Sequence, residues 1–379
     1  ITAGPQDSGA ALFRDGDLVA AVNEERFSRK KMDGRFPDRC LEHCLRAGGI
    51  EASQLHVVAH GWNMAADAAT LELVTGRLAE ESPEVAREMQ AFLEATNTCD
   101  RDVLRRLEAG LERWGIPRWK LQSYDHHLCH AAAALAHSRT FALDRMSALT
   151  AVEDQICVTL DGRGDYMSGR IVRGDLSVIA GTTMFDSIGF LWAFVTAALS
   201  FKPFRHEGKV LGLAAKGDPA QTLAIFQSFV ALAPSNSTAG RWNIRVRWSV
   251  GSGANFIPYF AELERDPGKA KSTLENYELC QLLRRHRRED VAAGLQAFTE
   301  SIVVEYLRRN GFLRRSLCVS GGVFSNVRLN MCLKELPEVD SFFVYPNMGD
   351  GGLCVGAALL AARERCHDGP PLLLPNTVF

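Results

Sequence analysis

The N-terminal part of the chain alternates between short apolar runs and polar turns, which is the pattern of β-hairpins. Residues 8–22 hold two apolar runs joined by Arg14-Asp15-Gly16-Asp17, and an Asp-Gly pair between such runs is a strong hairpin signal. Residues 156–178 repeat the plan, with an Asp, small residues, a strand, a Gly-Asp turn and a second strand. We interpret this similarity as a weak internal repeat and expect two related lobes.

Further along the chain, the apolar positions predict both helices and strands. Helical spacing, or a run that is apolar on every side, predicts helices at 38–47, 65–114, 187–199 and 290–309. Strands are predicted at 54–60, 316–320 and 342–345.

Chain length supports the division into two lobes, because single hydrophobic cores stop growing at about 250–300 residues and this chain has 379. We place the N-terminal lobe at residues 1–150, with a helical insertion at about 65–114. The C-terminal lobe takes residues 151–379, with a loop-rich insertion at about 231–268 that shows no clear period.

Composition narrows the class of protein. The net charge of -2 gives no overall basic field, so no nucleic-acid partner is expected. No apolar run approaches the roughly 18 residues of a membrane span, and no signal peptide opens the chain, so we expect a soluble cytoplasmic protein without a membrane partner. The ten cysteines include no CxxC pair, and buried free thiols in a reducing compartment are the expected state.

The strongest chemical signal is the block Ser123-Tyr124-Asp125-His126-His127-Leu128-Cys129-His130, which precedes an alanine run. On a helix His126 and His130 stand at i and i+4, so both imidazoles leave one face about 5–6 Å apart at Cβ. Such a pair chelates a metal once a third ligand is added. Asp350 lies at a strand's end among glycines and is the candidate third ligand; the alternative is that these histidines are core or capping residues.

Several turns have the residues that phosphate binding requires. Small residues beside Asp7 and Asp161 allow backbone N–H groups to approach phosphoryl oxygens, while the carboxylate holds a metal or a water. Taken alone, each of these segments is also typical of an ordinary β-hairpin without a phosphate. Gly321-Gly322 follows a predicted strand and leaves room for a nucleotide. Lys209 precedes a small-residue segment and either reaches a phosphate or lies on the surface.

Taken together, these motifs resemble those of the nodulation and antibiotic O-carbamoyltransferases, in the same order and over nearly the whole chain. The motifs are Asp7-Ser8-Gly9-Ala10-Ala11, Glu24-Glu25-Arg26-Phe27-Ser28-Arg29-Lys30-Lys31, His126-His127-Leu128-Cys129-His130-Ala131, Leu160-Asp161-Gly162, Glu207-Gly208-Lys209-Val210-Leu211-Gly212-Leu213-Ala214, Ser320-Gly321-Gly322-Val323 and Gly349-Asp350-Gly351-Gly352.

The resemblance implies an α/β fold, namely the duplicated, two-lobed actin/hexokinase-like (ASKHA) fold with mixed sheets flanked by helices. It also implies a relation to the enzymes that transfer a threonylcarbamoyl group to transfer RNA. The implied metal is iron, with Zn, Mn or Co as alternatives, and the implied nucleotide is ATP with Mg. The residues implied are His126, His130 and Asp350 for the metal, Asp161 for the phosphate side, Gly321, Gly322 and Asn326 for the nucleotide turn, Lys31 as an active-site lysine, and Asp7, Gly162, Gly164 and Lys209 for the nucleotide.

The implied reaction transfers a carbamoyl group from carbamoyladenylate, made from carbamoyl phosphate and ATP, to a hydroxyl of a small-molecule natural product. We expect acceptor specificity to lie in residues 231–268. His127 is a candidate proton acceptor for the attacking hydroxyl, from adjacency alone.

Two departures from the family pattern bear on activity. Gln6 stands where the family usually has His, and an amide cannot shuttle a proton near neutral pH. Family members also continue into a carbamoyladenylate-forming domain, whereas this sequence stops at Phe379, so we expect that domain to be removed or on a separate chain. Ile1-Thr2-Ala3-Gly4 reads like the end of a strand, and we expect residues to precede it.

Three alternatives stay open. The first is an ATP-dependent kinase of the same fold, and the second is a catalytically idle nucleotide-binding subunit. The third is a zinc hydrolase, which the histidine block fits poorly because it lacks the Glu of HExxH.

Overall fold

The computed structural model describes residues 1–4, 6–63, 66–144, 155–235, 240–248, 256–314 and 316–365. The expected lobe boundary at 150/151, parts of the expected insertion at 231–268 and the end of the chain at Phe379 lie outside these ranges.

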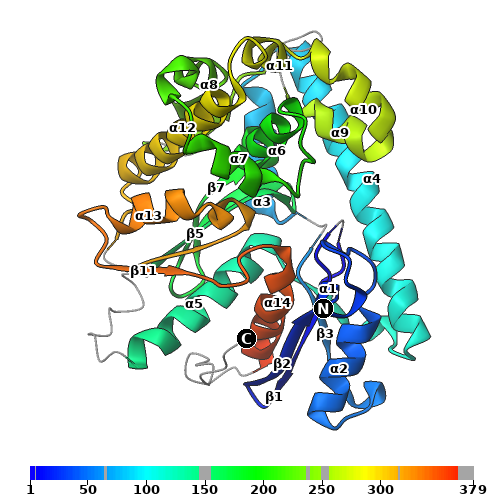
Figure 1. The fold of residues 1–379 in the computed structure, drawn as a ribbon. Helices are drawn as coiled ribbons and strands as arrows, with labels where there is room; N and C mark the ends of the chain where they lie inside the picture. The colour runs from blue at the N-terminus through cyan, green and yellow to red at the C-terminus, as the bar shows by residue number, and fades with distance from the viewer. Residues whose placement is uncertain are drawn as a thin grey trace.

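A five-stranded mixed sheet lies at the centre of the molecule, in the order β11-β10-β5-β6-β7 (Figure 1). Its middle strand pairs in parallel with β10 and antiparallel with β6. The strands are β5 (Gln155–Gly164), β6 (Met167–Arg173), β7 (Val178–Thr183), β10 (Ser316–Ser320) and β11 (Ser341–Val344). Both faces carry helices, so the predicted class of α/β fold with a mixed sheet flanked by helices is confirmed.

Alternate residues of β5 supply two different cores, as the period of two in a strand requires. Ile156 and Val158 pack into the cluster that contains α6 (Ile188–Ala198) and α12 (Arg288–Arg309). Cys157 faces the alanine run of α5 (His126–Asp144) and α14 (Leu353–Arg365). α5 is therefore fully covered on the side that faces the sheet, which explains why its residues 131–134 are all alanine and all buried.

The N-terminal hairpin forms as the sequence predicts, from β1 (Gly9–Arg14) and β2 (Asp17–Asn23). Asp15 and Gly16 have φ values of 54° and 93°, the left-handed region that an Asp-Gly turn favours. α2 (Asp38–Gly48) packs against this hairpin. The strand expected at 54–60 is shorter, because residues 52–54 form a single 3-10 turn and only β3 (Val58–His60) pairs, with β4 (Leu121–Ser123).

In the second part of the expected repeat, β6 and β7 form the hairpin. Asp161 does not lie in a turn, since β5 continues to Gly164 and the irregularity is a register shift between Leu160 and Gly164. The chain reverses at Asp165 and Tyr166, whose φ values are 49° and 73°. Residues 161–163 therefore form an irregularity within β5, and pairing with β6 resumes at Gly164, which lies opposite Met167.

The expected helical insertion contains two helices, α3 (Ala68–Ala79) and α4 (Pro83–Arg113). The helix that carries the histidine block and the alanine run, α5, extends from His126 to Asp144. In the expected loop-rich insertion the described residues are largely regular, with the antiparallel pair β8 and β9 followed by two helices. The remaining elements are α1 (Glu25–Ser28), α7 (Glu207–Ala214), α8 (Leu223–Phe229), β8 (Val230–Pro234), β9 (Trp242–Val246), α9 (Pro258–Arg265), α10 (Pro267–Thr273), α11 (Glu278–Leu283) and α13 (Val327–Lys334).

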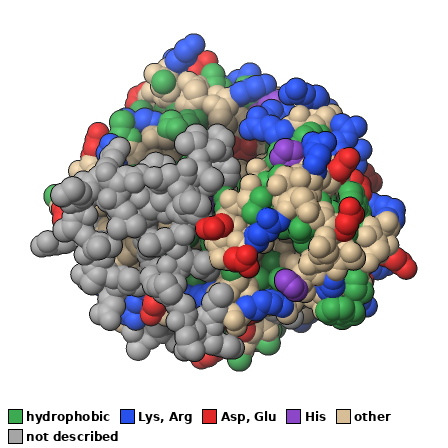
Figure 2. Space-filling model, turned by 90° about the horizontal axis from the view of Figure 1, so that it is seen from below, with side chains coloured by type: hydrophobic (Ala, Val, Ile, Leu, Met, Phe, Trp, Pro, Cys, Tyr) green, Lys and Arg blue, Asp and Glu red, His purple; other side chains and the backbone are tan. Residues whose placement is uncertain are grey.

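The distribution of surface charge and the state of the cysteines are as the composition predicts. Figure 2 shows acidic and basic side chains interspersed on one face, as the net charge of -2 leads one to expect. The nine cysteines in the described ranges are free, and seven of them are buried. Among the described helices, none combines the length and the apolar character needed to cross a membrane.

A buried charge network fastens α3 to the sheet. The Arg77 guanidinium lies 3.0 Å from the Asp186 carboxylate and also contacts Glu81, while Arg245 lies 3.5 Å from Asp186. Asp186 is fully buried, and a buried charge is stable only when it is paired.

We expect Arg77→Ala to lower the free energy of unfolding by about 3 kcal/mol, because it removes the closest cation from a buried carboxylate. Urea unfolding followed by circular dichroism measures the change. Arg105→Ala is the control, since Arg105 pairs with Asp102 on an exposed face of α4. An equal loss of unfolding free energy in the two variants would contradict the claim that the buried ion pair contributes more than the exposed one.

Candidate active site

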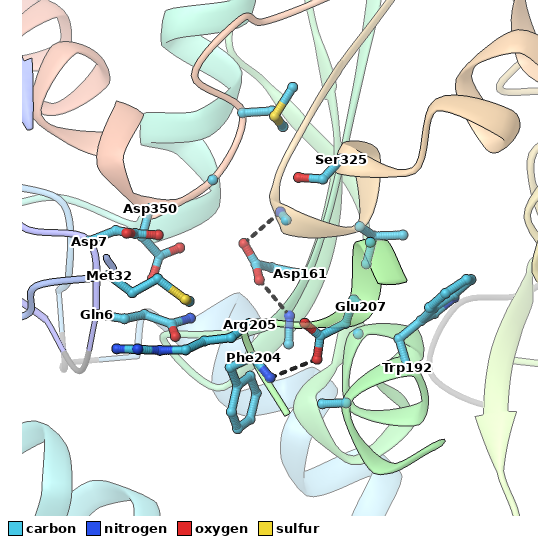
Figure 3. Close-up of a pocket in the computed structure, with 18 of the residues that line it drawn as sticks. Gln6, Asp7, Met32, Asp161, Trp192, Phe204, Arg205, Glu207, Ser325 and Asp350 are labelled. Atoms are coloured by element: carbon cyan, nitrogen blue, oxygen red, sulfur yellow. Dashed lines mark hydrogen bonds between the residues drawn. The ribbon is translucent and has the colours of Figure 1, made fainter. Parts of the chain in front are cut away.

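A cavity of about 840 Å³ opens between the N-terminal hairpin, the end of β5, α6 and α7 (Figure 3). Segments from both ends of the chain line it, including residues 6–7 and 347–350. Figure 3 shows Asp7 and Asp350 on one wall with Asp161 beside them, and Trp192 at the opposite end. One end is therefore rich in carboxylates, whereas Trp192 places an aromatic ring at the other end.

Four side chains meet behind the carboxylate end. His126 and His130 come from the first turns of α5, Asp161 from β5 and Asp350 from the turn before α14, and their ligand atoms all lie within 4.8 Å of one another. The His126 and His130 Nε2 atoms are 3.2 Å apart. His130 Nε2 lies 3.4 Å from Asp161 Oδ2, and His126 Nε2 lies 3.7 Å from Asp350 Oδ1.

This donor set fits a divalent transition metal. Two imidazole nitrogens and two carboxylates suit Fe, Zn, Mn or Co without selecting one of them. On its other nitrogen, His130 has a partner of the kind that metal-binding histidines use, because Nδ1 lies 3.4 Å from Ser320 Oγ. Asp161 is held by the backbone N–H groups of Gly162 and Gly322, at 2.6 and 3.0 Å.

The electrostatics of the cluster keep its imidazoles ready to bind. Burial, together with the neighbouring His130 and His127, holds the pKa of His126 well below its usual range, so the ring is neutral. Burial also raises the pKa of Asp350 well above its usual range, and nearby Asp161 and Asp7 add to that effect. For Asp161 burial is the largest influence and opposes ionisation, but the hydrogen bond and charge of His130 together with the backbone N–H groups of Gly322 and Gly162 outweigh it and lower the pKa. The pKa values of the two carboxyl groups are thus shifted in opposite directions, because two negative charges in one site repel each other.

Asp7, Gln6 and Lys31 line the cavity, as their place in the motifs suggested. Asp7 has a φ of 57°, and burial, followed by Glu25 and Asp161, raises its pKa to about 6. Lys31 is exposed and pairs with Glu25 at 2.8 Å. Arg205 joins this group by donating to the Lys31 carbonyl at 2.8 Å.

The predicted glycines divide into two kinds. Gly162 and Gly322 line the cavity. Gly164 and Gly321 instead allow close packing, because a Cβ would lie 2.2 Å from the His126 ring at Gly164 and 2.3 Å from the Leu160 carbonyl at Gly321. Gly321 also has a φ of 99°, which favours glycine.

Asn326 lines the cavity, but its side chain is occupied by structural bonds. It caps α13 by accepting from the Leu329 N–H at 3.0 Å and exchanges amide hydrogen bonds with Gln296. Any nucleotide contact of Asn326 would have to share these bonds.

Besides His126, His130, Gly164 and Gly321, two further predicted residues do not lie among the residues that line the cavity, namely His127 and Lys209. His127 is buried, and its Nδ1 lies 3.1 Å from Thr159 Oγ1. Burial lowers its pKa to about 4. Lys209 is exposed on α7, with Nζ 3.2 Å from His206 Nε2. The roles proposed for both remain predictions.

Several cavity residues were not predicted as site residues, notably Arg163, Arg205, Glu207 and Trp62. Arg163 is held by both oxygens of Asp100 on α4, at 2.8 and 2.9 Å. Glu207 lies at the first turn of α7, and burial raises its pKa. The sequence signal that could have identified Glu207 is a carboxylate at the start of a predicted helix, directly after Arg205-His206.

The fold and the site together define an α/β protein with a carboxylate and imidazole cluster at one end of a large cavity. A family model described as "Carbamoyltransferase N-terminus" matches residues 3–359, so the chain belongs to this family. The family expected from the motifs is thereby confirmed.

Relatives of known sequence agree with this membership. The nodulation protein NolNO of Sinorhizobium fredii is 28% identical over 96% of this chain and 47% of its own length. The nodulation protein U of Azorhizobium caulinodans is 25% identical over 94% of this chain and 60% of its own. This chain spans about half the length of the first of these relatives.

Likeness to solved structures is more distant. The match to component A of the (R)-2-hydroxyglutaryl-CoA dehydratase of Acidaminococcus fermentans covers 96% of this chain and 96% of that chain, with 16% identity and a TM-score of 0.44.

We expect Asp7→Asn to stabilise the protein at about pH 7.5, because the folded state holds the Asp7 pKa near 6 against an ordinary 3.8. A raised carboxyl pKa costs stability fully above the folded pKa, and the cost disappears below the unfolded pKa. We expect a gain of about 2 kcal/mol at the higher pH, falling towards zero at about pH 4.

Urea unfolding at the two pH values measures this difference. Asp15→Asn is the matched control, because Asp15 also has a positive φ, which Asn tolerates, and lies exposed in a turn. A gain in the free energy of unfolding for Asp7→Asn that is the same at both pH values would contradict the raised pKa of Asp7.

Proposed function

We propose that this chain carries out carbamoyl transfer, moving the carbamoyl group of carbamoyladenylate to a hydroxyl of a small-molecule acceptor. Membership of a carbamoyltransferase family supports the transferase class. The observation that carries the proposal is the cluster of His126, His130, Asp161 and Asp350 at one end of a cavity of about 840 Å³, which has room for a nucleotide and an acceptor group.

In this proposal, the four clustered side chains hold a divalent metal. When bound, such an ion polarises a carbonyl and stabilises negative charge on a leaving phosphate. Lys31 and Arg205 place further positive charge along the same wall. The backbone N–H groups of Gly162 and Gly322 fix Asp161, so its direction does not depend on the ligand.

The proton of the attacking hydroxyl needs an acceptor on the cavity wall. Gln6 lines the wall but carries no basic group, and His127 lies outside it. Asp7 lines the wall, and its pKa of about 6 suits a general base near neutral pH. We assign the proton-accepting role to Asp7.

The opposite end of the cavity suits the less polar parts of the ligands. Trp192 offers apolar surface there, Ser325 and Glu207 offer polar groups nearer the middle, and Phe190 and Leu211 add apolar lining to the cavity. ATP, carbamoyl phosphate and the carbamoyladenylate-forming step belong to the whole family protein in this proposal, either through a further domain or through a separate chain.

We expect purified protein to hold near-stoichiometric iron or another divalent ion, and His126→Ala to lose it, because the substitution removes one of four clustered ligands. Elemental analysis of both proteins, with and without ATP, makes the measurement. His56→Ala is the control, since His56 is exposed outside the cluster. No metal in the wild type under any condition would mean that the histidine block is structural.

We expect the metal-loaded protein to transfer the carbamoyl group from supplied carbamoyladenylate to alcohols in a panel of sugars and macrolides. Asp161→Asn should reduce the rate by about 10²-fold or more, because a group that acts on transition-state charge is worth that much. Radiolabelled carbamoyladenylate followed by chromatography measures transfer. Binding of nucleotide without any transfer would favour the non-catalytic subunit.

A further inference from the structure

The turn between β5 and β6 presents a buried carboxylate to two distant segments. Asp165 is only 4% exposed and has a φ of 49°. Its oxygens accept hydrogen bonds from the backbone N–H of Asn63, both at 2.9 Å, and Oδ2 accepts from the backbone N–H of His126 at 2.8 Å. One side chain therefore joins the residue after Trp62 to the first residue of α5.

The Asp165 carboxylate gives the backbone N–H of His126 an acceptor that α5 itself cannot provide. The first N–H groups of an α-helix have no acceptor within the helix. Asp125 takes the N–H of Leu128 at 2.8 Å, and its second oxygen is held by Arg170 at 2.7 Å. Asp165 takes the N–H of His126 and adds negative charge at the positive end of the helix.

The ring of His126 differs from that of His130 in what orients it. His130 Nδ1 lies 3.4 Å from Ser320 Oγ, whereas His126 Nδ1 is a buried nitrogen without a hydrogen-bond partner among the described residues. Packing fixes the His126 ring instead. Gly164 lies directly against it, and the Trp62 ring meets it edge-on with ring centroids 4.5 Å apart.

Gly164 and Trp62, which pack against the His126 ring, are the sequence neighbours of Asp165 and of its partner Asn63. Gly164 precedes Asp165, and Trp62 precedes Asn63, whose N–H Asp165 accepts. We propose that Asp165 is a positioning residue for the metal centre, which directs the His126 ring towards His130 and Asp350 by holding its backbone and both packing surfaces in register. This inference rests on the metal site of the proposed function.

Cobalt(II) titration of the apo protein, followed by visible absorption, tests the inference with a readout other than activity. We expect Asp165→Asn to weaken Co²⁺ binding by about 10–100-fold, the usual effect of losing an outer-shell partner, and to alter the absorption spectrum of the bound ion. Asn tolerates the positive φ. The Asn63 N–H approaches both Asp165 oxygens, so whichever way the amide is turned its NH₂ group, which cannot accept, faces that N–H, and the negative charge beside the start of α5 is lost.

Asp175→Asn is the matched control. Asp175 lies in the next turn and accepts from the Ser177 N–H at 2.8 Å, but in an exposed position. Wild-type affinity and spectrum in Asp165→Asn would overturn the positioning role and leave the metal site standing. No Co²⁺ binding by the wild type would instead overturn the metal site, and the inference with it.

Amide hydrogen exchange on the wild type covers the case in which Asp165→Asn does not fold. We expect the N–H groups of Asn63 and His126 to exchange slowly because both are hydrogen-bonded to the buried Asp165 carboxylate. Exchange of both as fast as the exposed Ser177 N–H would overturn the inference.

Discussion

The repulsion between two buried carboxylates shapes the region around the cavity. Asp161 and Asp350 approach the same pair of imidazoles, and neither can be ionised at low cost unless the charge is balanced. The protein holds Asp161 in its ionised form with backbone N–H groups and His130, and leaves Asp350 with a strongly raised pKa. A divalent cation is the simplest charge that would relieve both.

This constraint explains why the cluster draws on such distant parts of the chain. Each ligand needs a rigid support, and each support is a different element: α5 for the histidines, the end of β5 for Asp161 and the turn before α14 for Asp350. α5 and α14 pack against each other and α5 packs on the central sheet, so the ligand positions are set by a single buried assembly.

The parts of the fold that depend on local sequence were predictable, whereas those that depend on tertiary packing were not. The first hairpin follows from Asp15-Gly16, and the pairing of His126 with His130 follows from helix geometry. That β5 continues through this stretch depends on its pairing with β6 on both sides of the irregularity, at Leu160 and at Gly164, which the Gly and Asp content of residues 161–164 hides.

The site shows the same division. Asp350 was expected as a ligand, but that Asp161 shares the cluster depends on how closely β5 approaches α5, which spacing alone does not reveal. For Lys209 the sequence left a phosphate contact and a surface position open, because the direction of a side chain on a short helix depends on how the helix packs; the residue is exposed, and its contact with phosphate remains a prediction. Asp165 had no signal beyond its place after Gly164, because both of its partners lie far away in sequence.

The ion pair between Arg163 and Asp100 links the peripheral helices to the cavity wall. Domain shuffling usually adds or removes such peripheral segments as independent modules. Here, removal of α4 would take away the carboxylate that holds a cavity-lining guanidinium, so α4 and the cavity wall are constrained to change together.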